Sequence, residues 1–196
     1  MSQVHGWSGR TGAREGDARR RALLAAALLA TGLATALVTG CTAALDWRQL
    51  QPEGWSLVAA LPCKPASQQR QVVLAGQPVV LTMLACSADQ HTFALASAEL
   101  GDPARVVPVL QALGQAARAN VQGRVDAERP ALVPGMTPQP AARHWRLQGR
   151  LPGGQAVAEQ VQVFAHGTRV YQAAVIGPQA DDARAAPFFE ALKVLP

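Results

Sequence analysis

The sequence has few charged and few aromatic residues, and this shortage excludes several classes of protein. Of 196 residues, 16% are charged, 5% are aromatic and 49% are hydrophobic, a balance that excludes a disordered chain. The net charge of +5 does not indicate a nucleic-acid binder, because residues 1–40 hold five Arg against two acidic residues and contribute +3 of it. We therefore predict no nucleic-acid partner.

Motifs for catalysis, phosphate binding and metal binding are missing from the sequence. There is no Gly-x-Ser-x-Gly, and no Gly-rich loop stands between a predicted strand and a predicted helix. His91, His144 and His166 are isolated, so a metal site would have to be assembled entirely by the fold. We expect no catalytic residue, no metal and no cofactor.

Residues 1–40 have the pattern of an export signal. Arg19, Arg20 and Arg21 are followed by the seventeen uncharged residues 22–38. A basic segment in front of an apolar stretch is typical of a signal peptide. The alternative is an uncleaved membrane anchor, for which seventeen residues is at the short end of what a spanning helix needs.

The end of this stretch, Leu37-Val38-Thr39-Gly40-Cys41, resembles the lipobox of bacterial lipoproteins. That resemblance implies cleavage before Cys41 and acylation of its thiol and new amino terminus with chains such as palmitate, which hold a protein on a membrane essentially permanently. Thr42, rather than Asp, follows the cysteine. By the same resemblance this implies an outer-membrane lipoprotein facing the periplasm, with inner-membrane anchoring as the alternative.

The part after the lipobox is predicted to be a tether over residues 41–54 and a single domain over residues 55–196. Residues 55–61 are an apolar run typical of a strand, and the prolines of Leu61-Pro62-Cys63-Lys64-Pro65 interrupt regular pairing. Strands are then expected over 72–74, 79–86 and 91–97, with a hairpin turn at Asp89-Gln90. Three sequential strands predict a meander.

A helix and a second meander follow. Asp102 and Pro103 favour a helix start, and Gly123 is a stop signal. Residues 124–142 contain four Pro and no periodicity, and are predicted to be an irregular connection. Strands are expected over 143–151, 155–165 and up to 176, and a last helix from Asp181-Asp182.

Alternation over residues 143–151 predicts which side chains face the core. Trp145 and Leu147 fall on one side of that strand, so core burial favours a register that places them beside Val161 and Val163. The His166-Gly167 pair then favours a tight hairpin that pairs Val163 with Val170.

The order of strands, helix, strands and helix predicts an α+β fold, with an antiparallel sheet of about six strands in two meanders and two packed helices. This layout, together with the step at residues 61–65, resembles the PsbP/Mog1-like fold and uncharacterised proteobacterial lipoproteins of the same arrangement. The resemblance implies a role as an assembly or binding accessory. It brings no catalytic residues with it.

Two further predictions concern individual side chains. In an oxidising compartment, with Cys41 committed to lipid, the even pair Cys63 and Cys86 favours a disulfide. Arg143, Arg146 and Arg150, with Arg169, are candidates for a positive stripe that contacts phospholipid headgroups, lipopolysaccharide or an acidic partner. The other interpretation of this stripe is the solvated face of an antiparallel sheet.

These observations predict a membrane-anchored lipoprotein of the cell envelope that is not an enzyme and that binds, or helps to assemble, an envelope protein or glycan. One alternative is a small-ligand carrier, which needs a cavity between sheet and helices lined by Trp145, Phe93 and Phe189. The other is a single-pass protein anchored in the inner membrane.

Overall fold

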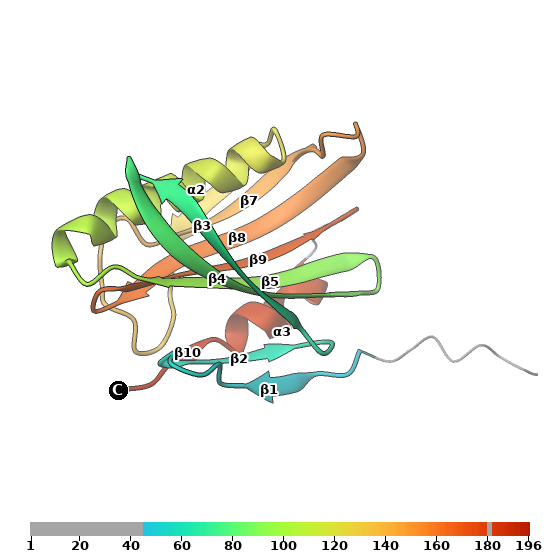
Figure 1. Ribbon diagram of the computed structural model, residues 1–196. Helices are drawn as coiled ribbons and strands as arrows, with labels where there is room; N and C mark the ends of the chain where they lie inside the picture. The colour runs from blue at the N-terminus through green and yellow to red at the C-terminus, as the bar shows by residue number, and fades with distance from the viewer. Residues whose placement is uncertain (1–44, 180–181) are drawn as a thin grey trace, which may run out of the picture. The chain divides into compact units, whose positions relative to one another are not determined.

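The computed structural model describes residues 45–179 and 182–196, and residues 45–196 belong to one compact unit (Figure 1). The predicted signal peptide, the lipobox, Cys41 and Asp181 lie outside the described residues. In the described part of the chain, no helix is long and apolar enough to cross a membrane.

The described elements are two helices, a short 3-10 turn and ten strands. In the first half they are β1 (Arg48–Leu50), β2 (Leu57–Leu61), β3 (Ala66–Leu74), β4 (Gln77–Ala88), β5 (His91–Glu99), η1 (Pro103–Arg105) and α2 (Val106–Asn120). In the second half they are β6 (Arg124–Pro130), β7 (Arg143–Arg150), β8 (Ala156–His166), β9 (Arg169–Gly177), α3 (Asp182–Glu190) and β10 (Lys193–Val194).

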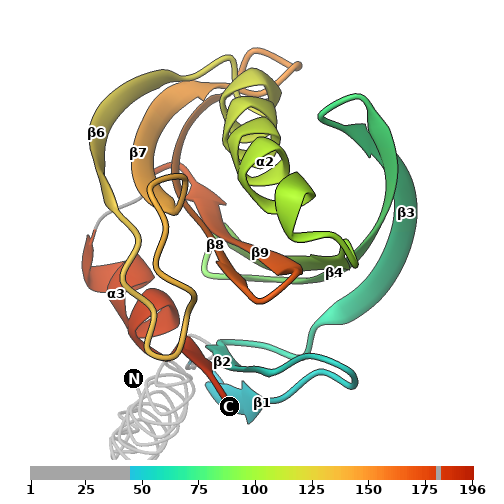
Figure 2. The ribbon, with the colours of Figure 1, turned by 90° about the vertical axis from the view of Figure 1, so that its left-hand side faces the viewer.

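Seven strands form one antiparallel sheet in the order β3-β4-β5-β9-β8-β7-β6, and β1, β2 and β10 form a second, small sheet. The large sheet curves around α2, while α3 and the small sheet lie on its other side (Figure 2). The structure thus confirms the predicted α+β class, the antiparallel sheet and the two helices. We call the side of the large sheet that faces α2 its concave face and the opposite side its convex face.

Three segments that the sequence analysis left outside strands are paired. Residues 124–130, predicted to be irregular, form the edge strand β6, whose side chains are all exposed and therefore show no hydrophobic alternation. Residues 48–50, within the predicted tether, form β1 against β2. The polar residues 66–71 extend β3, which pairs along its whole length with β4.

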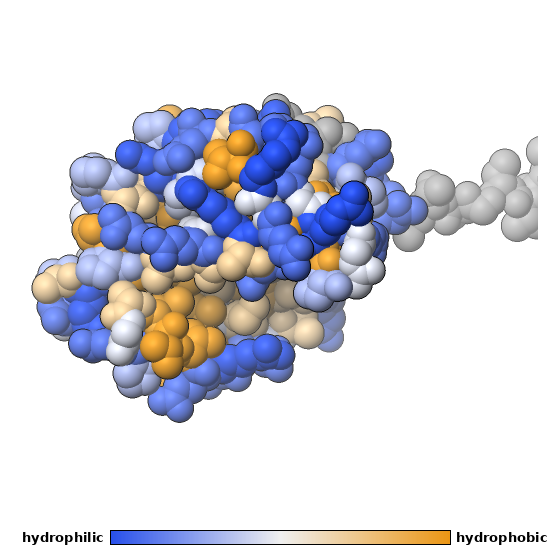
Figure 3. Space-filling view, turned by 90° about the horizontal axis from the view of Figure 1, so that it is seen from above, coloured by the Kyte–Doolittle hydropathy of each residue, from blue (hydrophilic) through white to orange (hydrophobic). Residues whose placement is uncertain are grey.

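Helix α2 begins and ends where the sequence predicts. The Asp102 side chain accepts a hydrogen bond from the backbone N–H of Ala104 at 2.9 Å, and Pro103 opens η1, which leads into the helix. At the other end, the backbone N–H of Gly123 donates to the carbonyl of Arg118 at 2.8 Å. Hydrophilic side chains cover much of the outer side of α2, and apolar ones are visible in the direction of β3 and β4 (Figure 3).

The hairpins have the predicted parity but a different register. Leu147 lies opposite Glu159, not Val161, because the β7–β8 loop includes all of residues 151–155. Val163 lies opposite Gln172, not Val170, because the final turn occupies Gly167-Thr168. A shift of two residues leaves each side chain on its own face, so Leu147 is fully buried as predicted.

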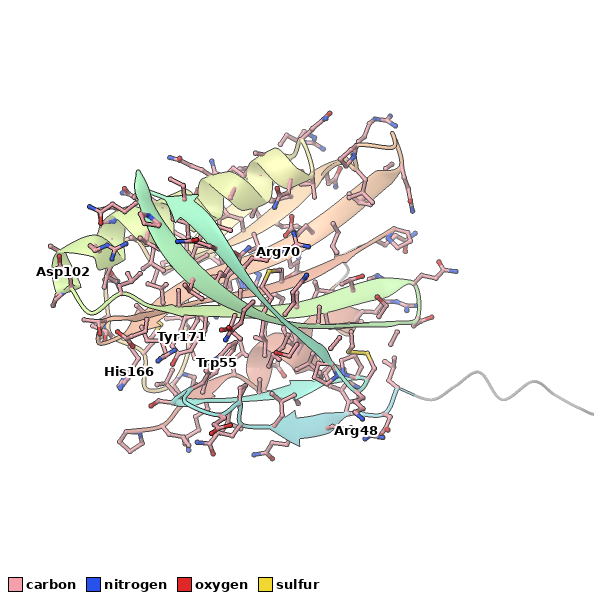
Figure 4. All side chains as sticks on the ribbon, viewed as in Figure 1. Arg48, Trp55, Arg70, Asp102, His166 and Tyr171 are labelled. Atoms are coloured by element: carbon pink, nitrogen blue, oxygen red, sulfur yellow. A yellow bond between two sulfur atoms is a disulfide. The ribbon has the colours of Figure 1, made fainter. Side chains whose placement is uncertain are left out.

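Each face of the large sheet carries its own hydrophobic core. The concave core joins α2 to the sheet and includes Trp145 and Leu147. The convex core joins the sheet to α3 and the small sheet, and Trp55 packs there edge-on against Tyr171 with ring centroids 6.0 Å apart (Figure 4). The two cores together explain why the strands in the middle of the sheet are buried on both sides.

A disulfide connects the two sheets. Cys63 follows β2 and Cys86 lies in β4, and their sulfur atoms are 2.05 Å apart, as the sequence analysis predicts. The bridge therefore closes the segment of chain that crosses from the small sheet to the large one.

Candidate functional site

One row of side chains across the convex face changes from apolar to polar along its length. On β5 and β9 the row consists of Leu95 and Ala173, which belong to the convex core. On β8, β7 and β6 it continues with Gln162, His144 and Arg129. Because polar side chains are costly to bury, a polar half on an otherwise apolar face marks a site that packing alone does not explain.

The polar half is a cluster of side chains around His144. His144 is 3% exposed, Gln160 3% and Gln162 4%. The Nδ1 atom of His144 lies 2.9 Å from the amide of Gln162, and its Nε2 atom lies 3.0 Å from Oε1 of Gln160. Arg129 on β6 reaches the same Nδ1 through Nη2 at 3.2 Å. Adjacent strands therefore hold the imidazole from both of its nitrogens.

The contacts define the protonation state of the imidazole. Burial lowers the pKa of His144, and the charges of Arg129 and Arg146 act in the same direction, while the hydrogen bonds with the side-chain oxygens of Gln162 and Gln160 raise it. A guanidinium only donates, so Nδ1 accepts from Arg129 and the proton sits on Nε2, which donates to Gln160. Among the described residues, the buried Nε2 atom of Gln162 has no hydrogen-bond partner.

This cluster forms the floor of a cavity of about 480 Å³, which we call the His144 pocket. Arg146 on β7 lines it as well. The other walls come from β6, the loop after β6, and α3: Ala127, Glu128, Leu132, Ala186, Phe189 and Glu190. A volume of this size falls within the range of small-molecule sites.

Two arginines, Arg129 and Arg146, and two glutamates, Glu128 and Glu190, are among the residues that line the pocket. Glu128 contacts Arg143 at 3.2 Å and Arg118 at 4.0 Å. Within the described part of the chain, Arg129 has no carboxylate partner and its only hydrogen-bond partner is His144. Arg129 is therefore a guanidinium at the pocket whose charge no ion pair among the described residues balances. This arrangement favours an anionic group in a ligand.

An aromatic ring closes one side of the site. The ring of Phe189 on α3 lies 4.6 Å from that of His144, centroid to centroid, at an angle of 48°. Side-chain amides, a guanidinium and an aromatic face are groups that hold a polar ligand in one orientation. Of the described residues, no Ser, Thr or Cys lines the pocket. The arrangement can bind and orient a ligand through hydrogen bonds, but its lining offers no hydroxyl or thiol nucleophile.

The predicted arginine stripe does not form on one face. Arg143 points to the concave side, where it pairs with Glu128, whereas Arg146 lines the His144 pocket on the convex side. Arg150 donates to the carbonyl of Gly154 at 2.9 Å, and Arg169 pairs with Glu99 at 3.3 Å on distant strands. Because neighbours along a strand point to opposite faces, Arg143 and Arg146 cannot share one.

Trp145, Phe93 and Phe189, the three side chains expected around an apolar cavity, do not line one common cavity among the described residues. Trp145 lies in the concave core, Phe93 in the convex core, and Phe189 at the wall of the polar pocket. The three rings are therefore separated by the sheet itself or by the packing of α3. Among the described residues, no three His, Cys, Asp or Glu side chains gather as metal ligands would.

The sequence analysis did not identify the His144 pocket. Its signal was present: polar residues at even positions of 143–151 continue with Gln160 and Gln162 on the next strand. Alternation alone predicts that this side of the strands faces solvent. The helix that covers it, α3, begins 22 residues after Gln160, so the local sequence does not show it. Comparison of the sequence with protein-family models and with curated proteins finds no match.

Proposed function

We propose that this protein is a lipoprotein of the bacterial envelope, anchored through Cys41 in the outer membrane and facing the periplasm, that binds a small polar ligand in the His144 pocket without transforming it. The observation that carries the binding role is the cluster of three buried polar side chains at the floor of a cavity. Polar groups buried at this cost are typical of binding sites.

We also propose that the domain has the PsbP/Mog1-like fold. The order of a meander, a helix, a second meander and a C-terminal helix on an antiparallel sheet supports this assignment. A non-enzymatic binding role agrees with it, and so does the pocket lining, in which the described residues include no hydroxyl or thiol side chain.

The anchoring part of the proposal makes a direct prediction. In cells that express the protein, replacing Cys41 by Ala is expected to abolish metabolic labelling with palmitate and to leave the precursor uncut, because the thiol is the acyl acceptor in the lipobox resemblance. Cys63→Ala serves as the matched control and should still be labelled. Palmitate incorporation that survives in the Cys41→Ala protein contradicts the anchor.

The binding part is tested by nuclear magnetic resonance on ¹⁵N-labelled protein titrated with glycerol 3-phosphate, D-glucuronate and N-acetylglucosamine. At least one compound should shift the side-chain signals of His144 and Gln162. The change Gln160→Leu should lower the affinity for that compound, measured from these shifts, by about tenfold, because it removes a hydrogen-bond partner from the pocket floor. The matched control is Gln172→Leu on the concave face. No shift with any compound, or equal responses in the two variants, contradicts the pocket.

A further inference from the structure

An apolar groove adjoins the His144 pocket. It is formed by the loop that follows β6, has a volume of about 540 Å³, and is lined by residues that are nearly all apolar. Pro130, Leu132, Val133, Met136, Pro138 and Ala142 contribute to it. Leu132 lines both the groove and the His144 pocket, so the two spaces meet at its side chain.

Leu132 is exposed in an unusual way. Its side chain is 83% exposed, more than that of any other large exposed hydrophobic residue in the described part of the chain. An exposed aliphatic side chain between a polar and an apolar cavity contributes nothing to the core. It does supply contact surface for a ligand that passes from one cavity to the other.

The groove is held open by the fold. The loop that forms it is fixed at both ends, because the N–H of Ala131 donates to the carbonyl of Ala142 at 3.1 Å. Two hydrogen bonds of 2.8 Å fix its middle. The N–H of Thr137 donates to the carbonyl of Ala165, and the N–H of Val194 donates to the carbonyl of Pro134. The prolines of the lining bring no N–H group into the groove, so its walls have few hydrogen-bond donors.

Charge identifies one end of the ligand. Arg129, which lines the His144 pocket and has no carboxylate partner among residues 45–179 and 182–196, is followed directly by Pro130, which lines the groove. A ligand whose anionic group reaches the guanidinium therefore has the apolar groove next to its pocket, because the two cavities share Leu132. A purely polar ligand leaves the groove empty, and a purely apolar one leaves the charge of Arg129 unmatched.

We infer that the ligand is an anionic amphiphile, with its charged head in the His144 pocket against Arg129 and its aliphatic chain past Leu132 in the groove. This inference rests on the proposed function and specifies the ligand class. It accounts for two neighbouring cavities of opposite polarity with one molecule. A protein held on a membrane by acyl chains would find such amphiphiles in its immediate surroundings.

The experiment is calorimetric titration of the intact protein with three probes below their micelle-forming concentrations: decanoate, butanoate and decyl maltoside. Decanoate should bind at least about tenfold more tightly than butanoate, because each methylene buried in the groove adds affinity. It should also bind more tightly than the uncharged decyl maltoside.

Two variants separate the head from the chain. Arg129→Gln should lower the affinity for decanoate by about tenfold and leave the affinity for decyl maltoside unchanged, since only the charged head loses a partner. Leu132→Asn should lower the affinity for decanoate by about tenfold and leave the affinity for butanoate unchanged. The matched control is Val73→Asn, at a residue 72% exposed on β3, which should bind all probes as the parent protein does.

Three outcomes overturn the inference. Equal affinities for decanoate and butanoate mean that the groove does not hold the chain, while the pocket still binds. Binding of decyl maltoside as tight as that of decanoate means that the head need not be anionic. If Val73→Asn lowers the affinity for decanoate as much as Leu132→Asn does, exposed apolar residues bind decanoate unspecifically. The proposed function itself fails in a separate measurement, if the polar compounds above leave the pocket signals unmoved or if Gln160→Leu and Gln172→Leu respond alike.

Discussion

Replacing Glu159 by Gln is expected to raise the free energy of unfolding by about 3 kcal/mol above about pH 7, and to leave it almost unchanged below about pH 4. Glu159 lies on the concave face between Leu147 and Ile176 and is 7% exposed. Its Oε2 atom has no hydrogen-bond partner in the part of the chain that the structure describes. Burial raises the pKa of this carboxyl to about 7.

The sign of the effect follows from the two states of the chain. At a pH below the ordinary pKa of 4.5, the carboxyl is protonated in both the folded and the unfolded chain. Its burial then lowers the free energy of unfolding only slightly. As the pH rises towards 7 the unfolded chain loses this proton more readily than the folded one, so the folded protein loses stability. Above the folded pKa the loss is complete, and the shift from 4.5 to about 7 converts to about 3 kcal/mol.

Denaturant unfolding across this pH range, compared between the parent protein and Glu159→Gln, measures the difference directly. The matched control is Glu53→Gln at an exposed position, which should stay within about 0.5 kcal/mol of the parent throughout. Stability curves of parent and Glu159→Gln that run parallel from acid to neutral pH would show that the carboxyl is not held in a protonated state by burial.

Removing the disulfide is expected to lower the free energy of unfolding by about 3.5 kcal/mol. Cys63 and Cys86 are 23 positions apart, and an unfolded chain without the bridge recovers the freedom of that closed loop. The small sheet also loses its covalent link to β4. We therefore expect the double variant Cys63→Ala, Cys86→Ala to unfold at lower denaturant concentration than the parent protein.

Reduction of the parent protein supplies an independent measurement of the same quantity. Dithiothreitol should lower the stability of the parent as much as the double substitution does, and should have no effect on the double variant. A double variant as stable as the oxidised parent would refute a stabilising bridge. Alkylation of the denatured, unreduced parent that labels Cys63 and Cys86 would refute the bridge altogether.

The sequence predicted those elements whose signals are local. Asp102 and Pro103 mark the start of η1 and α2, and the Asp89-Gln90 turn occurs at positive φ as a tight hairpin requires. Strand β6 escaped prediction because an edge strand exposed on both faces has no alternation to detect. The register of β7 and β8 followed parity correctly, yet the loop length that sets the exact partner is decided by tertiary packing.

The candidate site depends on information that no single segment contains. His144, Gln160 and Gln162 look like solvent-facing positions of two strands until the hairpin register brings them together. The ring of Phe189 on α3, much further along the chain, then packs against the imidazole of His144. The same limit applies to the arginines, for which the sequence correctly separates Arg146 from Trp145 but does not show that Arg143 meets Glu128 on β6.

The floor of the His144 pocket belongs to strands inside the sheet, whereas Leu132 and Phe189 at its rim come from a loop and from a helix. Side chains already fixed by ladder pairing and by one another lose little rotational freedom when a ligand arrives, so the floor is preorganised. Leu132 and Phe189 lie outside the strands of the large sheet and take no part in its ladder pairing. Ligand preference can therefore change by substitution in the loop and at the end of α3, while the floor and the fold that supports it stay the same.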